Sequence, residues 1–157
     1  MPHSDINPRA HLSIHPFAVA HKLQMPAALF QAFKKAACVA NRDCKALVTD
    51  FQEAIDCLTR YQTDIEEGLI TIHVPDTNNL IFLSDVREAY LVYMQKLIAC
   101  STTNDQANMF RSAYMALTPL FNLHDPWYAK SSYSKRITEA KESLEAALFW
   151  AELGARS

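Results

Sequence analysis

The chain contains only two glycines among its 157 residues, Gly68 and Gly154. Glycine adopts positive φ angles at little steric cost, and hairpin-rich β folds usually need several such positions. The shortage therefore disfavours a β fold and favours helices joined by short connections. It also excludes two common nucleotide-binding motifs, because neither GxGxxG nor GxxxxGK[ST] can be assembled from two such distant glycines.

The composition is that of one globular domain. Half of the residues are hydrophobic (50%) and a fifth are charged (20%), a balance far from that of disordered chains. We expect residues 26–157 to form a single domain. Residues 1–25 hold three prolines and four of the six histidines without a sustained helical period, so we expect an irregular arm there.

Charge and targeting signals limit the partners and the location. A net charge of −2 provides no field to attract long nucleic acid or an anionic membrane. The first residues resemble no signal peptide, and no apolar stretch approaches the ~20 residues of a membrane span. The expectation is therefore a cytoplasmic protein with neither a membrane nor a long nucleic acid as partner.

Apolar residues recur at steps of three and four and predict about five helices. The ranges are about 26–40, 43–67, 84–100, 103–118 and 134–154. Asp43 is the predicted cap of the second, Ser84 or Asp85 of the third, and Thr103 lies in the capping segment of the fourth, which Pro119 should interrupt. Gly68 and Gly154 should end the second and fifth helices.

The segment 69–74 alternates β-branched residues and allows one short strand, although a lone strand needs a partner. Together these patterns predict an all-α fold, an antiparallel or orthogonal bundle of about five helices. The apolar seam of the last helix would be formed by Ile137, Ala140, Leu144, Ala147, Leu148 and Ala151.

Metal binding and catalysis find little support in the sequence. His11 and His15 are four residues apart and His21 lies six further on, but the nearby prolines disfavour a shared helix and no third ligand is evident. The four cysteines lack CxxC spacing and are predicted to be reduced thiols. No nucleophile–base signature is found, so we expect a non-catalytic protein without metal or cofactor.

The most informative stretch is 127–136, which reads WYAKSSYSKR. Trp127, Tyr128 and Tyr133 would stack on bases at ~1–3 kcal/mol each. Phosphate oxygens would contact the three cations Lys130, Lys135 and Arg136, beside a helix N-terminus. These residues form the predicted ligand-binding site. The alternative is that the aromatic rings simply pack against one end of the bundle.

Phe149 and Trp150 lie off the main seam of the last helix. The apolar face of this helix is therefore wider than packing within one bundle requires. Such a face predicts an interface between copies of the chain and hence a homo-oligomer.

The last helix also carries a family resemblance. Its segment 140–151 reads AKESLEAALFWA. This segment resembles the C-terminal helix of phage anti-CBASS cyclic-nucleotide sponges of the second type, which show a Leu-Glu-x-Ala/Ser-x-x-Trp-Ala pattern. The likeness covers about a dozen residues, and this chain is considerably longer than those proteins.

The resemblance implies a small helical protein that oligomerises and sequesters cyclic di- or trinucleotide signals without cleaving them. It also implies a phage origin and action in the bacterial host cytoplasm. A Tyr or His-Pro segment precedes the helices of those sponges, and here His124-Asp125-Pro126 or His15-Pro16 would correspond. The rival hypothesis is a protein-interaction module, an inhibitor or adaptor of a host protein.

Overall fold

The computed structural model describes residues 15–72, 77–126 and 133–156, which form six α-helices and one short 3-10 helix. The elements are α1 (Pro16–Leu23), α2 (Ala27–Ala37), α3 (Cys44–Glu66), η4 (Thr77–Asn79), α4 (Leu80–Ala99), α5 (Asn104–Asn122) and α6 (Tyr133–Ala155). No strand occurs in these ranges, which confirms the all-α prediction. Residues 69–72 of the candidate strand form an irregular connection, and 73–74 lie outside the described residues.

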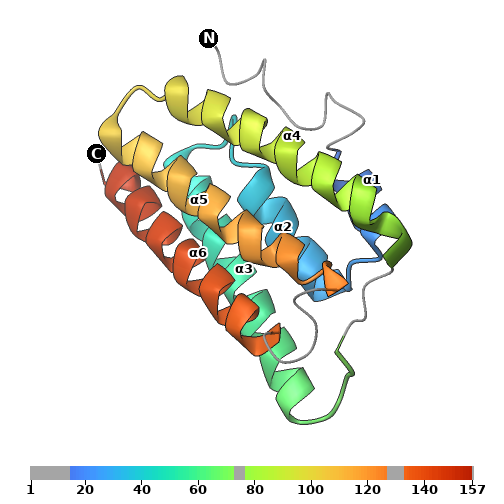
Figure 1. Cartoon of the computed structure of the whole chain (residues 1–157). Helices are drawn as coiled ribbons and strands as arrows, with labels where there is room; N and C mark the ends of the chain where they lie inside the picture. Colours follow the sequence, from blue (N-terminus) through green and yellow to red (C-terminus); the bar gives the residue numbers. More distant parts are fainter. Residues whose placement is uncertain (1–14, 73–76, 127–132, 157) are drawn as a thin grey trace.

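Four helices form a closed ring around the core. Helix α2 packs on α3, α3 on α6, α6 on α5, and α5 again on α2. Helix α4 lies outside this ring and packs along α5, antiparallel to it (Figure 1). Within the described residues, no helix is both long and apolar enough to cross a membrane.

Local signals set several helix ends as predicted. The Asp43 carboxylate accepts a 2.7 Å hydrogen bond from the Ala46 N–H and caps α3. The Thr103 hydroxyl oxygen accepts a 3.1 Å bond from the Gln106 N–H at the start of α5. At the end of α3, Gly68 has φ +74°, and Leu69 N–H donates to Asp64 O at 2.9 Å, which is a Schellman turn.

Two predicted N-terminal boundaries are wrong, and packing explains both. The expected irregular arm contains α1, which begins with Pro16 at its first turn and buries Val19 and Leu23 in the core. Helix α4 begins at Leu80, four residues before the predicted cap Ser84, because Leu83 is fully buried and extends the apolar stripe toward the N-terminus.

Two predictions about helix breakers are also wrong. Helix α5 continues through Pro119 to Asn122. The Pro119 side chain is buried, so its packing offsets the missing backbone hydrogen bond. Helix α6 continues past Gly154 to Ala155, since Gly154 is needed for a close approach to Cys44 and not for a left-handed turn.

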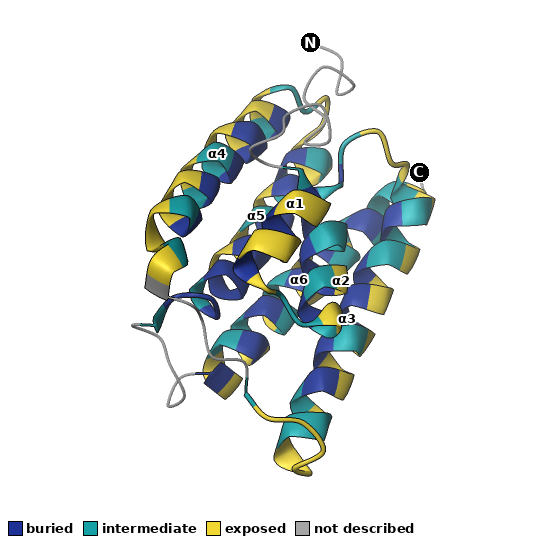
Figure 2. Cartoon of the chain, turned by 90° about the vertical axis from the view of Figure 1, so that its right-hand side faces the viewer, coloured by how far each residue is buried: buried dark blue, intermediate teal, exposed yellow. Residues whose placement is uncertain are grey.

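An aromatic cluster attaches α4 to the ring. The Tyr90 ring lies 5.5 Å from Phe33 of α2 and 5.7 Å from Phe121 of α5, centroid to centroid. The Tyr93 hydroxyl donates to Ala37 O at 3.3 Å. Figure 2 shows the buried inner sides of the helices and the exposed outer side of α4.

The apolar seam predicted for the last helix is confirmed by the burial of α6. Its fully buried residues are Ile137, Ala140, Leu144, Ala147 and Ala151, and Leu148 packs against the core from a half-buried position.

Candidate ligand site between helices α4 and α5

A surface cavity of about 360 Å³ lies between the second and third turns of α4 and the C-terminal half of α5. Each helix contributes side chains spaced at three and four residues, which places them on one face. Its apolar wall consists of Leu91, Leu117 and Phe121. Its polar rim consists of Ser84, Arg87, Glu88, Tyr114 and Thr118.

Arg87 is the cation of this cavity, and α5 fixes its position. Its Nη2 donates to Asn122 Oδ1 at 2.9 Å and to Asp125 Oδ2 at 3.1 Å. The Asp125 residue is only 8% exposed, whereas the Arg87 side chain is 33% exposed. The buried Asp125 carboxylate therefore holds a guanidinium that is still partly exposed to solvent. Within the described residues, the Nε and Nη1 atoms of Arg87 make no hydrogen bond.

The chain segment after α5 positions the carboxylate. His124 N–H donates to Phe121 O at 2.9 Å and Asp125 N–H to Asn122 O at 3.1 Å, so the helical winding continues for one more turn. The buried His124 ring places Nδ1 3.0 Å from Leu120 O. This turn directs Asp125 toward α4.

The cavity can bind a small polar molecule with an apolar part. Arg87 suits a carboxylate or a phosphate, because guanidinium N–H groups match paired acceptor oxygens. Glu88, exposed beside it, accepts hydrogen bonds from amino or hydroxyl groups. Leu91, Leu117 and the Phe121 ring offer apolar contact. This combination of groups is typical of ligand pockets.

Of the predicted ligand residues in 127–136, the structure describes Tyr133, Lys135 and Arg136. Trp127, Tyr128 and Lys130 lie outside the described residues. Tyr133 is 2% exposed, and its hydroxyl oxygen lies 2.9 Å from that of Tyr61 on α3. Its predicted role in base stacking does not fit this position, because the first residue of α6 faces the seam with α3.

The two remaining cations, Lys135 and Arg136, differ in exposure. Lys135 is exposed on α6. Arg136 has a largely buried side chain and forms an ion pair with Glu139, Nη1 to Oε2 3.3 Å, one turn along the same helix. Their contact with a ligand stays a prediction.

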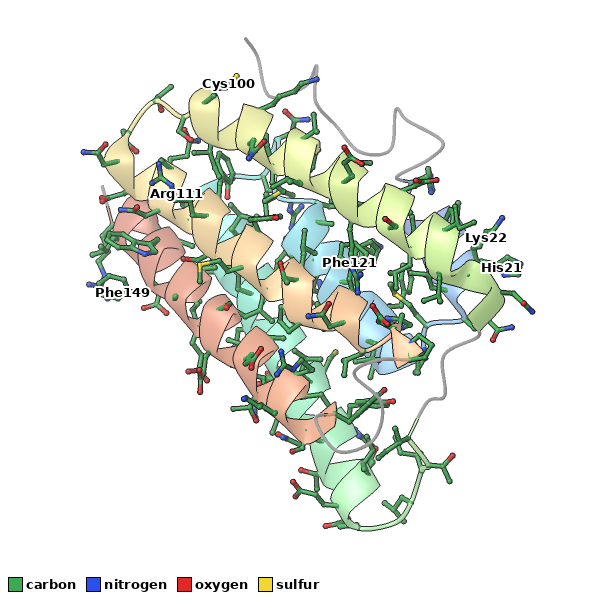
Figure 3. The ribbon with its side chains drawn as sticks, viewed as in Figure 1. His21, Lys22, Cys100, Arg111, Phe121 and Phe149 are labelled. Carbon is green, nitrogen blue, oxygen red and sulfur yellow. The ribbon has the colours of Figure 1, made fainter. Side chains whose placement is uncertain are left out.

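The two residues predicted to form an oligomer interface adopt different positions on α6. Phe149 is 55% exposed and points away from the bundle (Figure 3). Trp150 is half-buried against the core and meets the Phe149 ring edge-to-face at 5.1 Å. The interface itself stays a prediction.

Potential metal ligands and thiols are scattered. Among the described residues, no three His, Cys, Asp or Glu side chains are close enough to hold a metal ion. His15 lies just before α1 with its ring 5.8 Å from Phe17, His21 is exposed on α1, and His11 is outside the described residues. All four cysteines are half-buried thiols and not disulfides.

The α4–α5 cavity was not predicted from the sequence. Arg87 precedes Asn122 and Asp125 by 35 and 38 positions, so no local spacing joins them. The available signal was the polar pair His124-Asp125 in the segment that follows the predicted helix 103–118, but this pair does not indicate its partner on another helix. Comparisons with protein-family models, curated proteins and solved structures gave no match.

Proposed function

We propose that this protein is a non-catalytic binding protein that sequesters a small anionic ligand in the cavity between α4 and α5. The observation that carries the proposal is Arg87, whose guanidinium is held by Asp125 and Asn122 at the rim of a cavity of about 360 Å³. That volume falls within the range of ~300–1,000 Å³ typical of small-molecule sites.

The chemistry of the cavity favours a nucleotide over a simple anion. A phosphate would bind to Arg87, and the half-buried Tyr114 ring at the rim would contact a base. Glu88 would accept hydrogen bonds from the amino or sugar hydroxyl groups that nucleotides carry and inorganic anions lack.

The more specific proposal is a cyclic nucleotide immune signal, which would make the protein a phage anti-defence sponge in the host cytoplasm. It is supported by the resemblance of residues 140–151 to the sponge family. The residues 127–130, which follow Asp125 and Pro126 in the chain, would add the predicted stacking rings of Trp127 and Tyr128.

Thermal unfolding in the presence of ligands tests the proposal. The panel consists of cyclic di- and trinucleotides and signalling mononucleotides, each well above the protein concentration. A ligand at 100 times its Kd should stabilise the protein by ~2.7 kcal/mol. Chromatography of the ligand recovered afterwards should show it intact, because sequestration leaves the phosphodiester bonds unbroken.

The site assignment is tested by removing the cation and its buried counter-ion together. Arg87→Met alone would remove the cation that faces the buried Asp125 carboxylate and destabilise the fold, so Arg87→Met/Asp125→Asn is the better variant. It should fold and lose the ligand-induced shift. Arg111→Met, on the exposed face of the same α5 helix, should keep it. An unchanged shift in the double variant, or no shift across the panel in the wild type, would overturn the proposal.

Exposed apolar side chains on α5 and α6 favour a second candidate function, that of an inhibitor or adaptor of a host protein. Phe149 and Met115 are 55% and 60% exposed on α6 and α5. For this candidate, Phe149→Ser should weaken a pull-down from host extract and leave any nucleotide shift unchanged. For the binding protein, the same change should leave nucleotide capture intact.

A further inference from the structure

Helix α1, Lys34 of α2 and the start of α4 form a surface that combines apolar and cationic side chains. We call it the α1 surface, and it consists of Phe17, Lys22, Lys34, Leu80 and Ile81. Phe17 is 52% exposed and Ile81 80% exposed. Figure 2 shows α1 facing the viewer, with the exposed beginning of α4 beside it. Asn79, directly before α4, donates a 2.8 Å hydrogen bond from Nδ2 to Lys22 O and so joins α1 to the start of α4.

The two lysines of the α1 surface lie over aromatic rings. Lys34 Nζ is 5.1 Å from the centroid of Phe17, and Lys22 Nζ is 5.0 Å from that of Phe82. Within the described residues neither ammonium forms an ion pair. The next residue, Lys35, is different, because its Nζ lies 2.7 Å from Glu53 Oε2 and 3.5 Å from Asp50 Oδ1. Among the described residues, the α1 surface therefore presents positive charge that no ion pair neutralises.

The C-terminal end of α3 has the opposite character. We call residues 64–70 the acidic tip. Glu66 and Glu67 are exposed there, Leu69 is 69% exposed, and Ile70 is also exposed. The Schellman turn at Gly68 fixes their arrangement. Figure 1 shows this end of α3 projecting beyond the rest of the bundle.

The two glutamates occupy positions where they destabilise the C-terminal end of α3. Carboxylates are unfavourable at a helix C-terminus, where the backbone carbonyls already carry partial negative charge. The last turn of α3 contains no basic residue to compensate, and within the described part of the chain no cation pairs with Glu66 or Glu67. Departures from local rules of this kind are expected at functional surfaces.

We propose that the acidic tip of one copy docks on the α1 surface of a second copy. Two carboxylates of the tip would meet the two unpaired ammonium groups, while Leu69 and Ile70 would cover Phe17 and Ile81. Charge complementarity favours a second copy as the partner, because the α1 surface is positively charged and the acidic tip is negatively charged. Among the described residues, opposite charges border both patches: Asp85 lies one turn beyond Ile81, and Arg60 lies one turn before Asp64. Neither reverses the sign of its patch.

This contact differs from the interface predicted at Phe149 and Trp150, and it does not depend on the proposed ligand site. The contact joins two different patches, so a copy that uses its acidic tip still has a free α1 surface, and the reverse. Further copies can therefore add to the assembly unless the rotation between copies closes a ring. Its charged pairs are solvent-exposed, so association should weaken as salt increases.

Charge reversal with sedimentation velocity tests the contact. The wild-type protein should associate with increasing concentration at low ionic strength. Lys22→Glu/Lys34→Glu and Glu66→Lys/Glu67→Lys should each weaken self-association about tenfold or more, because like charges then face each other. An equimolar mixture of the two variants should associate again, since an acidic surface now meets a basic tip.

Two control variants keep the test specific. Lys45→Glu/Lys96→Glu makes the same charge change at exposed positions outside both patches and should leave association unchanged. Phe149→Ser should also leave it unchanged. The proposal is overturned if the wild type stays monomeric, if the mixture fails to associate, or if Phe149→Ser alone abolishes association. Binding of a monomeric wild type to phosphatidylserine vesicles, lost in Lys22→Glu/Lys34→Glu, would instead assign the α1 surface to a membrane.

Discussion

At the scale of single residues, the two glycines have different structural roles. Gly68 needs its positive φ of 74°, and a Cβ there would meet no atom within 4 Å. Gly154 has ordinary helical geometry, but a Cβ would clash with the Cys44 Sγ and lie 3.3 Å from the Cys44 Cβ. A glycine at position 154 therefore allows the end of α6 to approach the start of α3.

Gly154→Ala should destabilise the protein by ~1–3 kcal/mol in urea unfolding, because the added methyl overpacks the contact with Cys44. Removing the thiol first should relieve most of this cost, so Gly154→Ala measured in a Cys44→Ala background should change stability by less than ~0.5 kcal/mol. Gly68→Ala should cost ~1–2 kcal/mol from backbone strain in both backgrounds. Equal costs of Gly154→Ala in the two backgrounds would rule out the clash.

At the scale of elements, the side-chain charges stabilise the N-terminal end of helix α3 and destabilise its C-terminal end. Asp43 satisfies the Ala46 N–H and places a negative charge at the positive end of the helix. The acidic tip at the other end adds negative charge to a terminus that is already negative. The length and apolar packing of α3 compensate, since it contacts both α2 and α6 along the ring.

The capping role of Asp43 is measurable. Asp43→Ala should lower the free energy of unfolding by ~0.5–2 kcal/mol, since the Ala46 N–H loses its acceptor. Asp43→Asn keeps an acceptor oxygen and should cost much less. Equal losses in the two variants, measured by urea unfolding, would show that charge and not the hydrogen bond stabilises this end.

At the scale of the whole molecule, the attachment of α4 depends on tyrosines that cannot easily ionise. Burial raises the pKa of Tyr90 and of Tyr93 well above the ordinary value, and the neighbouring Cys38 thiol adds to both increases. In the unfolded chain, tyrosines ionise at about pH 10. Above that pH the folded state binds more protons than the unfolded state, so stability falls as pH rises.

The resulting prediction is alkaline unfolding controlled by the aromatic cluster. Above about pH 10, each of the two tyrosines should reduce stability by up to ~1.4 kcal/mol per pH unit. Tyr90→Phe/Tyr93→Phe should be less stable at pH 7, because Ala37 O loses a donor, but should show a shallower decline above pH 10. Urea midpoints between pH 7 and 12 provide the comparison, and parallel declines would contradict the assignment.

The sequence by itself determined features that depend on a few neighbouring residues. Asp43 and Thr103 cap their helices, Gly68 ends α3, and the apolar steps of α6 identify its buried seam. Each of these follows from backbone geometry and from residues three or four positions apart, which is why periodicity and capping rules identify them.

Only the tertiary structure decided which distant residues meet. It joined Arg87 to Asp125, buried Tyr133 against Tyr61, and retained Pro119 within a helix whose packing offsets the lost hydrogen bond. It also extended helices into α1 and the first turn of α4 through burial of Val19 and Leu83. The physical reason is that burial and contacts between helices depend on how the whole chain packs, and local propensity carries no information about a partner many residues away.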